Sequence, residues 1–188
     1  MEHSTATVYF AKPGPSNTAR VLEIAGARAR ELGIRRVVVA TTRGETAVAA
    51  TRVFPGDSLV AVTHVFGGRA PNDQELTAEN RQKLEEAGVR IVTAAHAFGG
   101  AGRAVRKKLG AVQVDEIIAH TLRLWGEGTK VAVEITLMAA DAGLVRTDEE
   151  VIAIGGTNQG ADTALVLQPA NTHSLFDLRV REILCQPR

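Results

Sequence analysis

Short β-branched runs alternate with longer helical segments along most of this chain. The runs at residues 36–40 and 58–63 are almost wholly apolar, which is typical of strands buried on both faces of a parallel sheet. A helical segment follows each run, and such βα units stack into a sheet that helices cover. We therefore expect a three-layer α/β fold, in which a mostly parallel, mixed sheet is flanked by helices.

The same patterns place the individual elements. We expect strands at residues 7–10, 36–40, 58–63, 89–93, 149–154 and 164–167, and either an edge strand or a short helix at 178–184. Helices are expected at residues 17–32, from the loop at 41–46 to residue 53, and at 74–87, 112–124 and 130–142. Asn17 is expected to be the N-cap of the helix at 17–32. The glycine-rich segment 99–102 suggests a mobile loop. Because no linker or low-complexity segment interrupts the pattern, residues 1–188 are expected to form one domain.

Composition and charge narrow the classes of function. The formal charge is +1, from 22 basic and 21 acidic residues without a basic patch, which disfavours a nucleic-acid partner. The single cysteine, Cys185, excludes an internal disulfide and a cysteine-based zinc site, and we expect no metal. The N-terminus shows no secretory signal, and the longest apolar stretch, near residues 131–140, is too short to span a bilayer. We expect a cytoplasmic protein with no membrane partner.

Residues 41–47 are the strongest candidate for a binding site. A buried strand runs into a loop with three threonines and a glycine, and then directly into a helix; the segment comprises Thr41, Thr42, Arg43, Gly44, Glu45, Thr46 and Ala47. Free N–H groups at a helix start, together with the positive end of the helix dipole, suit an anion. Gly44 would let the backbone approach the ligand, and Arg43 would add charge-assisted hydrogen bonds. On the residues alone, an ordinary threonine N-cap explains the pattern equally well.

Three further segments hold polar residues near the expected ends of strands. Residues 61–68 and 93–100 resemble each other: each leaves a strand, passes a histidine (His64 or His96) and enters a Phe-Gly-Gly turn. Ligands of open α/β sheets bind beyond the carboxyl ends of the strands, so these histidines are candidates for an acid–base pair or for ring contacts, although loop histidines are more often structural or solvated. The glycine-rich loop at 155–163 either forms a lip of the pocket, through Thr157, or is only a tight connection.

The expected helix at 130–142 is apolar almost all round. Its polar stripe consists of Lys130, Glu134 and Asp141. From the residues alone, a solvent-exposed edge with a Lys130–Glu134 pair is the simpler interpretation. The alternative is that part of this stripe faces a ligand.

Two common nucleotide motifs are missing from the sequence. It has no Gly-x-x-x-x-Gly-Lys-Ser/Thr segment, and the first expected strand leads into Lys-Pro-Gly-Pro instead of Gly-x-Gly-x-x-Gly. A P-loop NTPase and a conventional Rossmann dinucleotide site are both disfavoured.

The segment at residues 41–47 resembles the effector-phosphate loop in the C-terminal α/β domain of pyruvate kinase. Nearly the whole chain is more similar still to a group of stand-alone proteins built from that domain alone. The shared pattern comprises Tyr9-Phe10, Pro13-Gly14, Asn17-Thr18, Lys-Val-Ala-Val-Glu at 130–134, Met-Ala-Ala-Asp-Ala-Gly at 138–143 and Gly-Ala-Asp-Thr at 160–163.

The resemblance implies a pyruvate kinase C-terminal domain-like fold and bound FMN. It implies no kinase activity, because the active site of pyruvate kinase lies in a barrel domain that 188 residues are too few to include. It also implies a homo-oligomer. We expect a phosphorylated small molecule, first of all FMN, to bind through Asn17, Thr18, Thr41, Thr42, Arg43, Gly44, Thr46, Ala47, Thr63, His64, His96, Glu134, Asp141 and Thr157.

The phosphate is expected at residues 41–47, with the ring toward the two histidine loops and polar ligand groups at Glu134 and Asp141. Catalytic residues are unknown. A non-catalytic sensor of a sugar phosphate and a flavin-dependent reductase are the alternatives. A phosphate-ester hydrolase ranks last, because no nucleophile–base set is evident.

Overall fold

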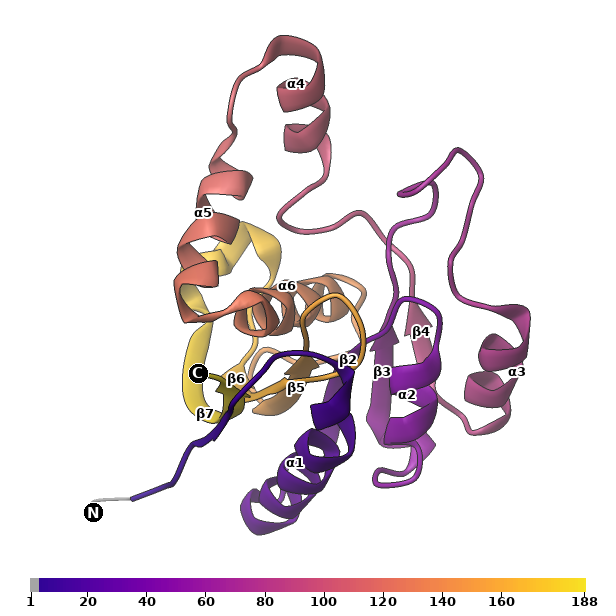
Figure 1. Cartoon of the computed structure of the whole chain (residues 1–188), viewed down its shortest axis with the longest axis vertical. Coiled ribbons are helices and arrows are strands. Elements are labelled where there is room, and N and C mark those ends of the chain that lie inside the picture. Colours follow the sequence, from indigo (N-terminus) through magenta and orange to yellow (C-terminus); the bar gives the residue numbers. More distant parts are fainter. Residues whose placement is uncertain (1–3) are drawn as a thin grey trace.

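A seven-stranded sheet organises the protein, whose computed structural model describes residues 4–188 (Figure 1). The strand order is β1-β7-β6-β5-β2-β3-β4. The strands are β1 (Val8–Phe10), β2 (Arg36–Ala40), β3 (Leu59–Val62), β4 (Arg90–Val92), β5 (Val151–Gly155), β6 (Thr163–Gln168) and β7 (Arg179–Pro187). Only β6 runs antiparallel to its neighbours, so the sheet is mixed and mostly parallel, as predicted.

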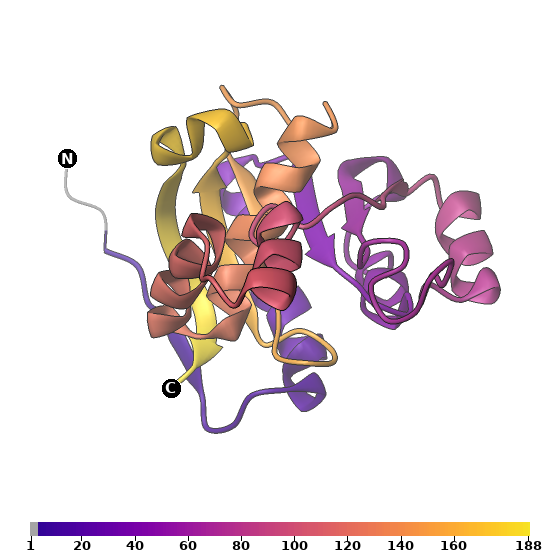
Figure 2. The same ribbon diagram turned by 90° about the horizontal axis from the view of Figure 1, so that it is seen from above.

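Helices cover both faces of this sheet. They are α1 (Thr18–Leu32), α2 (Glu45–Ala50), α3 (Ala78–Glu86), α4 (Ala101–Leu109), α5 (Val114–Leu122) and α6 (Glu127–Asp141), with single 3-10 turns η1 (Pro15–Asn17), η2 (Gly56–Ser58), η3 (Arg123–Trp125) and the longer η4 (Thr172–Asp177). In the view from above, α2, β3, β4 and α3 extend to one side, at one end of the sheet (Figure 2). No helix among residues 4–188 is both long and apolar enough to cross a membrane.

The alternation of side chains along β2 shows how the layers are built. Val37 and Val39 pack into a cluster with α1, α2 and α3, whereas Val38 packs into a second cluster with α6. Since successive strand residues point to opposite faces, one apolar strand supplies both cores. This is the physical reason for the continuous apolar run that predicted the three-layer fold, and the prediction is confirmed.

Several element predictions were wrong in extent. The glycine-rich segment predicted as a loop leads directly into α4, which begins at Ala101 and has no buried residue. The helix predicted from residue 74 begins only at Ala78, after the N-cap Thr77, whose hydroxyl accepts the N–H of Asn80 (3.2 Å). The segment at 178–184 is part of β7, which pairs with both β1 and β6 and is therefore an interior strand.

Asn17 stands at the N-cap position of α1 but does not cap it. Its side-chain amide donates to the carbonyls of Lys12 (2.8 Å) and Gly14 (3.2 Å), so it stabilises the loop that precedes the helix. The preceding 3-10 turn leads straight into α1, and the Asn17 backbone is already helical. The predicted side-chain cap is therefore wrong, because the residue serves the loop instead of the helix.

Candidate functional site

The carboxyl ends of the six parallel strands meet at one edge of the sheet. In the neighbouring strands β2, β3 and β4 the ladder continues one residue beyond the strand ends: the N–H of Thr41 donates to Val62 and that of Thr63 to Val92 (both 2.9 Å). The loops that follow these strands therefore leave the sheet side by side. They carry most of the residues predicted to bind the ligand.

The backbone at residues 42–47 offers a row of free donors. Among the described residues, none accepts a hydrogen bond from the N–H groups of this segment; the first N–H of α2 with a protein acceptor is that of Val48, which bonds to Gly44 (2.9 Å). No side chain caps the helix. The hydroxyl of Thr41, which is 6% exposed, is buried without a hydrogen-bond partner. Such a concave row of N–H groups at a helix start is an anion site in many proteins.

Gly44 has a packing role. Its φ of 109° lies in the left-handed region, and an added Cβ would stand 2.4 Å from the Cβ of Asn80 and 2.9 Å from Leu76. The glycine thus lets α3 and its preceding loop pack closely against the start of α2. The carbonyl of Arg43 accepts hydrogen bonds from the side-chain amide of Asn80 (3.0 Å) and the N–H of Thr77 (3.3 Å), so α3 anchors the loop.

The charged side chains of the loop face away from the core. Arg43 and Glu45 are both exposed and form an ion pair of 3.5 Å. Thr46 and Ala47 are buried in the first turn of α2, whereas Thr42 is half-buried. Arg43 is free to move toward a bound anion, because an exposed ion pair is worth little.

A buried carboxylate joins two further loops at the same edge. Asp162 is fully buried and accepts the N–H groups of Gly14 (3.0 Å) and Thr157 (3.1 Å), and its other oxygen accepts the hydroxyl of Thr163 (2.9 Å). Nearby, the hydroxyl of Thr18 accepts the N–H of Ala161 (2.9 Å). Thr18 and Thr157 therefore lie at the sheet edge as predicted, but both already take part in holding loops together.

Between these loops lies a small open pocket. Its volume is about 280 Å³, and its walls are Pro13, Gly14, Pro15, Thr157, Asn158 and Gln159. Since β5 is the neighbour of β2, this pocket belongs to the same edge as the free N–H row.

The two predicted histidines lie together. Their ring centroids are 5.4 Å apart, tilted by 57°. The Nδ1 atom of His64 is 2.9 Å from a carboxylate oxygen of Glu75, and Nε2 of His96 accepts the N–H of Val65 (3.2 Å). Beside them, the hydroxyl of Thr63 is 2.7 Å from that of Thr93. The repeat in the sequence thus places both imidazoles at one point of the edge.

The pair formed by Lys130 and Glu134 is buried, contrary to the solvent-exposed pair that we predicted. The two side chains are 6% and 5% exposed and are bonded to each other. The other oxygen of Glu134 accepts the N–H of Phe98 (3.0 Å), which holds the loop of His96. Nδ1 of His96 is 3.9 Å from Glu134. Burial lowers the pKa of His96, although the Glu134 carboxylate alone would raise it.

Asp141 does not lie with these residues. It stands at the C-terminal end of α6, and its carboxylate accepts the N–H of Thr172 (3.0 Å) and the side-chain amide of Asn171 (3.1 Å). The beginning of α6 packs against Gly155 at the end of β5, so Asp141 is near the opposite edge of the sheet. Glu134 and Asp141 are seven positions apart, which is about two turns or roughly 10 Å along the helix, so the two carboxylates are separated.

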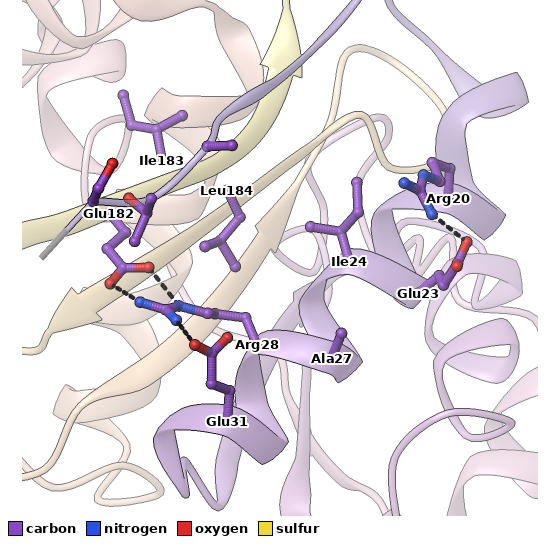
Figure 3. A pocket seen from close by; sticks show the side chains of 12 residues that line it. Arg20, Glu23, Ile24, Ala27, Arg28, Glu31, Glu182, Ile183 and Leu184 are labelled. Carbon is purple, nitrogen blue, oxygen red and sulfur yellow. Dashed lines mark hydrogen bonds and ion pairs between the residues drawn. The ribbon is translucent and has the colours of Figure 1, made fainter.

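A larger groove contains none of the predicted site residues. It has a volume of about 400 Å³ and lies between α1, the middle of β7 and residues 4–6 (Figure 3). Its charged groups bind one another: Arg28 pairs with Glu182 and Glu31, and Arg20 pairs with Glu23 (Figure 3). The Arg28–Glu182 pair ties α1 to β7, the other two pairs lie within α1, and together they leave little charge for a ligand.

Sequence reasoning missed three polar residues of the edge. Asp162 was part of a motif at 160–163 but was not singled out, although an aspartate between small residues at a strand start indicates a buried role. Glu75 lies in a polar loop and Thr93 ends an ordinary strand, and neither position carries a signal in one sequence. Only the fold brings them to the histidines.

Comparison with known proteins agrees with this architecture. A family model described as "Pyruvate kinase, alpha/beta domain" matches residues 19–167. The pyruvate kinase of Cryptosporidium parvum aligns with 16% identity and a TM-score of 0.41, over 85% of this chain and 23% of that chain. Its complex with ADP aligns with 18% identity and a TM-score of 0.39, over 84% and 24%. The chain thus spans about a quarter of those enzymes. Because the family model covers most of its residues, the protein belongs to the family of the pyruvate kinase α/β domain.

Proposed function

We propose that this protein binds a phosphorylated small molecule, first of all FMN, with its phosphate on residues 41–47. The observation that carries the proposal is the row of unused N–H groups from Thr42 to Ala47, beside the unpartnered hydroxyl of Thr41. The hydroxyl of Thr41 is buried, and a buried polar group is costly unless something is hydrogen-bonded to it. A phosphate has three strong acceptor oxygens and a negative charge that suits the N-terminus of α2.

The rest of the ligand would extend along the edge. On one side lie the histidine loops, where the exposed Phe66 offers an apolar surface that a flat ring could cover. On the other side lies the 280 Å³ pocket between the 13–15 and 157–159 loops. The choice of FMN over another phosphate ester rests on the family resemblance, and a sugar phosphate bound by a non-catalytic sensor would use the same phosphate contacts.

A comparison of FMN with riboflavin tests the phosphate contacts directly. Apoprotein should quench FMN fluorescence and absorb near ~450 nm when loaded, and it should bind FMN at least tenfold more tightly than riboflavin. Thr42→Asp puts a carboxylate beside the N–H row and should abolish most of that difference. Thr147→Asp, at an exposed position before β5, adds the same charge and should leave it intact.

The outcomes separate the alternatives. Equal affinity for FMN and riboflavin, or an unchanged FMN affinity in Thr42→Asp, would contradict the phosphate assignment. If neither flavin binds but ribose 5-phosphate raises the melting temperature, the phosphate site stands and FMN is wrong. If bound flavin is reduced by NAD(P)H at a useful rate, the reductase becomes the better proposal.

The resemblance also predicts a homo-oligomer. Large apolar side chains are exposed on and after α5, namely Val114, Ile117, Leu124 and Trp125. Exposed apolar side chains of this number offer contact area for a second copy. Sedimentation velocity at two protein concentrations would test the oligomer.

A further inference from the structure

The side chain of His64 is held by a carboxylate in a way that leaves one ring nitrogen available. Its Nδ1 atom is 2.9 Å from Glu75, and an ionised carboxylate can only accept, so Nδ1 carries the proton. In the neutral ring Nε2 is then an acceptor. Among residues 4–188, no protein group donates to it, and the side chain is 50% exposed.

His96 differs from His64 although the two rings are neighbours. Its Nε2 is already used, because it accepts the N–H of Val65. Its side chain is 18% exposed and backed by the buried Lys130–Glu134 pair. His96 therefore orients the loop around His64, whereas His64 alone presents a free acceptor.

The position of this acceptor relates it to the phosphate site. Thr41 and Thr63 continue the parallel ladder of β2 and β3, and the N–H row starts at Thr42 just as His64 follows Thr63. Neighbouring strands are about 4.8 Å apart, so the two loops leave the sheet within reach of one small molecule. A ligand with its phosphate at residues 42–47 would bring its body to His64.

We propose that His64, positioned by Glu75, is the proton-accepting group for the body of the ligand. This inference rests on the proposed function. The ligand class is a phosphate monoester whose body carries an O–H or N–H donor within a few ångströms of the phosphate, as in a flavin or a sugar. A histidine whose Nδ1–H is bound to a carboxylate is the arrangement that makes Nε2 a base in many enzymes. Glu75 is a positioning residue, because it acts only through the ring.

The first test needs no ligand. Long-range ¹H–¹⁵N spectra of the full chain should show neutral His64 with its proton on Nδ1. Glu75→Ala should shift His64 toward the other tautomer, and Glu75→Asp should restore much of the original state. A His64 that is protonated on Nε2 in the unaltered protein would overturn the proposal.

Binding of two probes forms the second test. His64→Ala should weaken FMN about tenfold, Glu75→Ala should weaken it severalfold, and His64→Gln should recover part of the loss through its amide oxygen. Inorganic phosphate should bind equally to all of these variants. If phosphate binds but the His64 variants bind FMN as tightly as the unaltered protein does, this inference fails and the phosphate site stands. If phosphate and FMN both fail to bind the unaltered protein, the proposed function fails. This role of His64 then fails with it, even if His64 carries its proton on Nδ1.

Discussion

Replacing Asp162 should loosen two loops of the site at once. The carboxylate is fully buried and accepts the N–H groups of Gly14 and Thr157. In Asp162→Ala both N–H groups lose their acceptor, as does the hydroxyl of Thr163, which can rotate. The N–H of Gly14 is buried, at a cost of about 2–3 kcal/mol, and that of Thr157 is partly hydrated, at about 1 kcal/mol. We expect a loss of about 3–4 kcal/mol, which for a chain of this length lowers the melting temperature by about 6–16 °C.

The size of this effect should depend on the acceptor and not on the charge. In Asp162→Asn the remaining oxygen can still accept both N–H groups, while the hydroxyl of Thr163 can turn to accept from the new amide. The expected loss is then about 1 kcal/mol, measured by thermal unfolding under the same conditions. Asp148→Ala removes an exposed carboxylate paired with Arg146 and should leave the melting temperature almost unchanged. An Asp162→Ala variant that melts like Asp148→Ala would refute the reasoning.

Three other perturbations probe buried groups. Lys130→Met leaves Glu134 charged and unpaired in the core, so the free energy of unfolding in urea should fall by about 3–5 kcal/mol. Adding Glu134→Gln should recover much of this loss. If the losses of the two single variants simply added in the double variant, the pairing would be contradicted. Burial raises the pKa of Cys185 to about 12, so a thiol reagent at pH 8 should label it only in denaturant, and stoichiometric labelling of the folded protein would be the opposite result. The pKa of His96 lies below its unfolded value, about 6.5, so the neutral ring contributes stability above that pH. This contribution is lost as the pH falls through the pKa of the folded protein. The melting temperature should therefore drop between pH 7 and 5, and it should drop less in His96→Gln.

The fold was predictable because its cause is local in the sequence. The apolar run at 36–40 already shows a strand buried on both faces, and it alternates with helical segments as a parallel sheet requires. What failed was the extent or role of elements at the margins of the sheet. The glycines at 99–102 favoured a loop, although Ala101, Ala104, Val105 and Leu109 recur at helical spacing in α4, and none of these residues is buried.

The site was predictable only as far as strand ends could be located. Thr41 and His64 follow apolar runs, and the geometry of a parallel sheet brings such positions together without further information. The environment of a charged residue is not local in this sense. Lys130 and Glu134 look like an exposed helical pair, and burial is decided by the sheet, by α5 and by the loop of Phe98. Glu75 reaches His64 through the course of a loop, which periodicity does not describe.

The two halves of the candidate site are held from opposite faces of the sheet. The loop at residues 41–47, the proposed phosphate site, is anchored to α3 and its N-cap by the hydrogen bonds that Asn80 and Thr77 donate to the carbonyl of Arg43. The loop of His96 is anchored to α6, because Glu134 accepts the N–H of Phe98. Since each anchor belongs to a different core cluster, the spacing between phosphate and imidazole depends on the sheet between them. A parallel sheet packed on both faces is the most rigid part of such a domain, so it would keep the two loops at a fixed spacing for the proposed ligand.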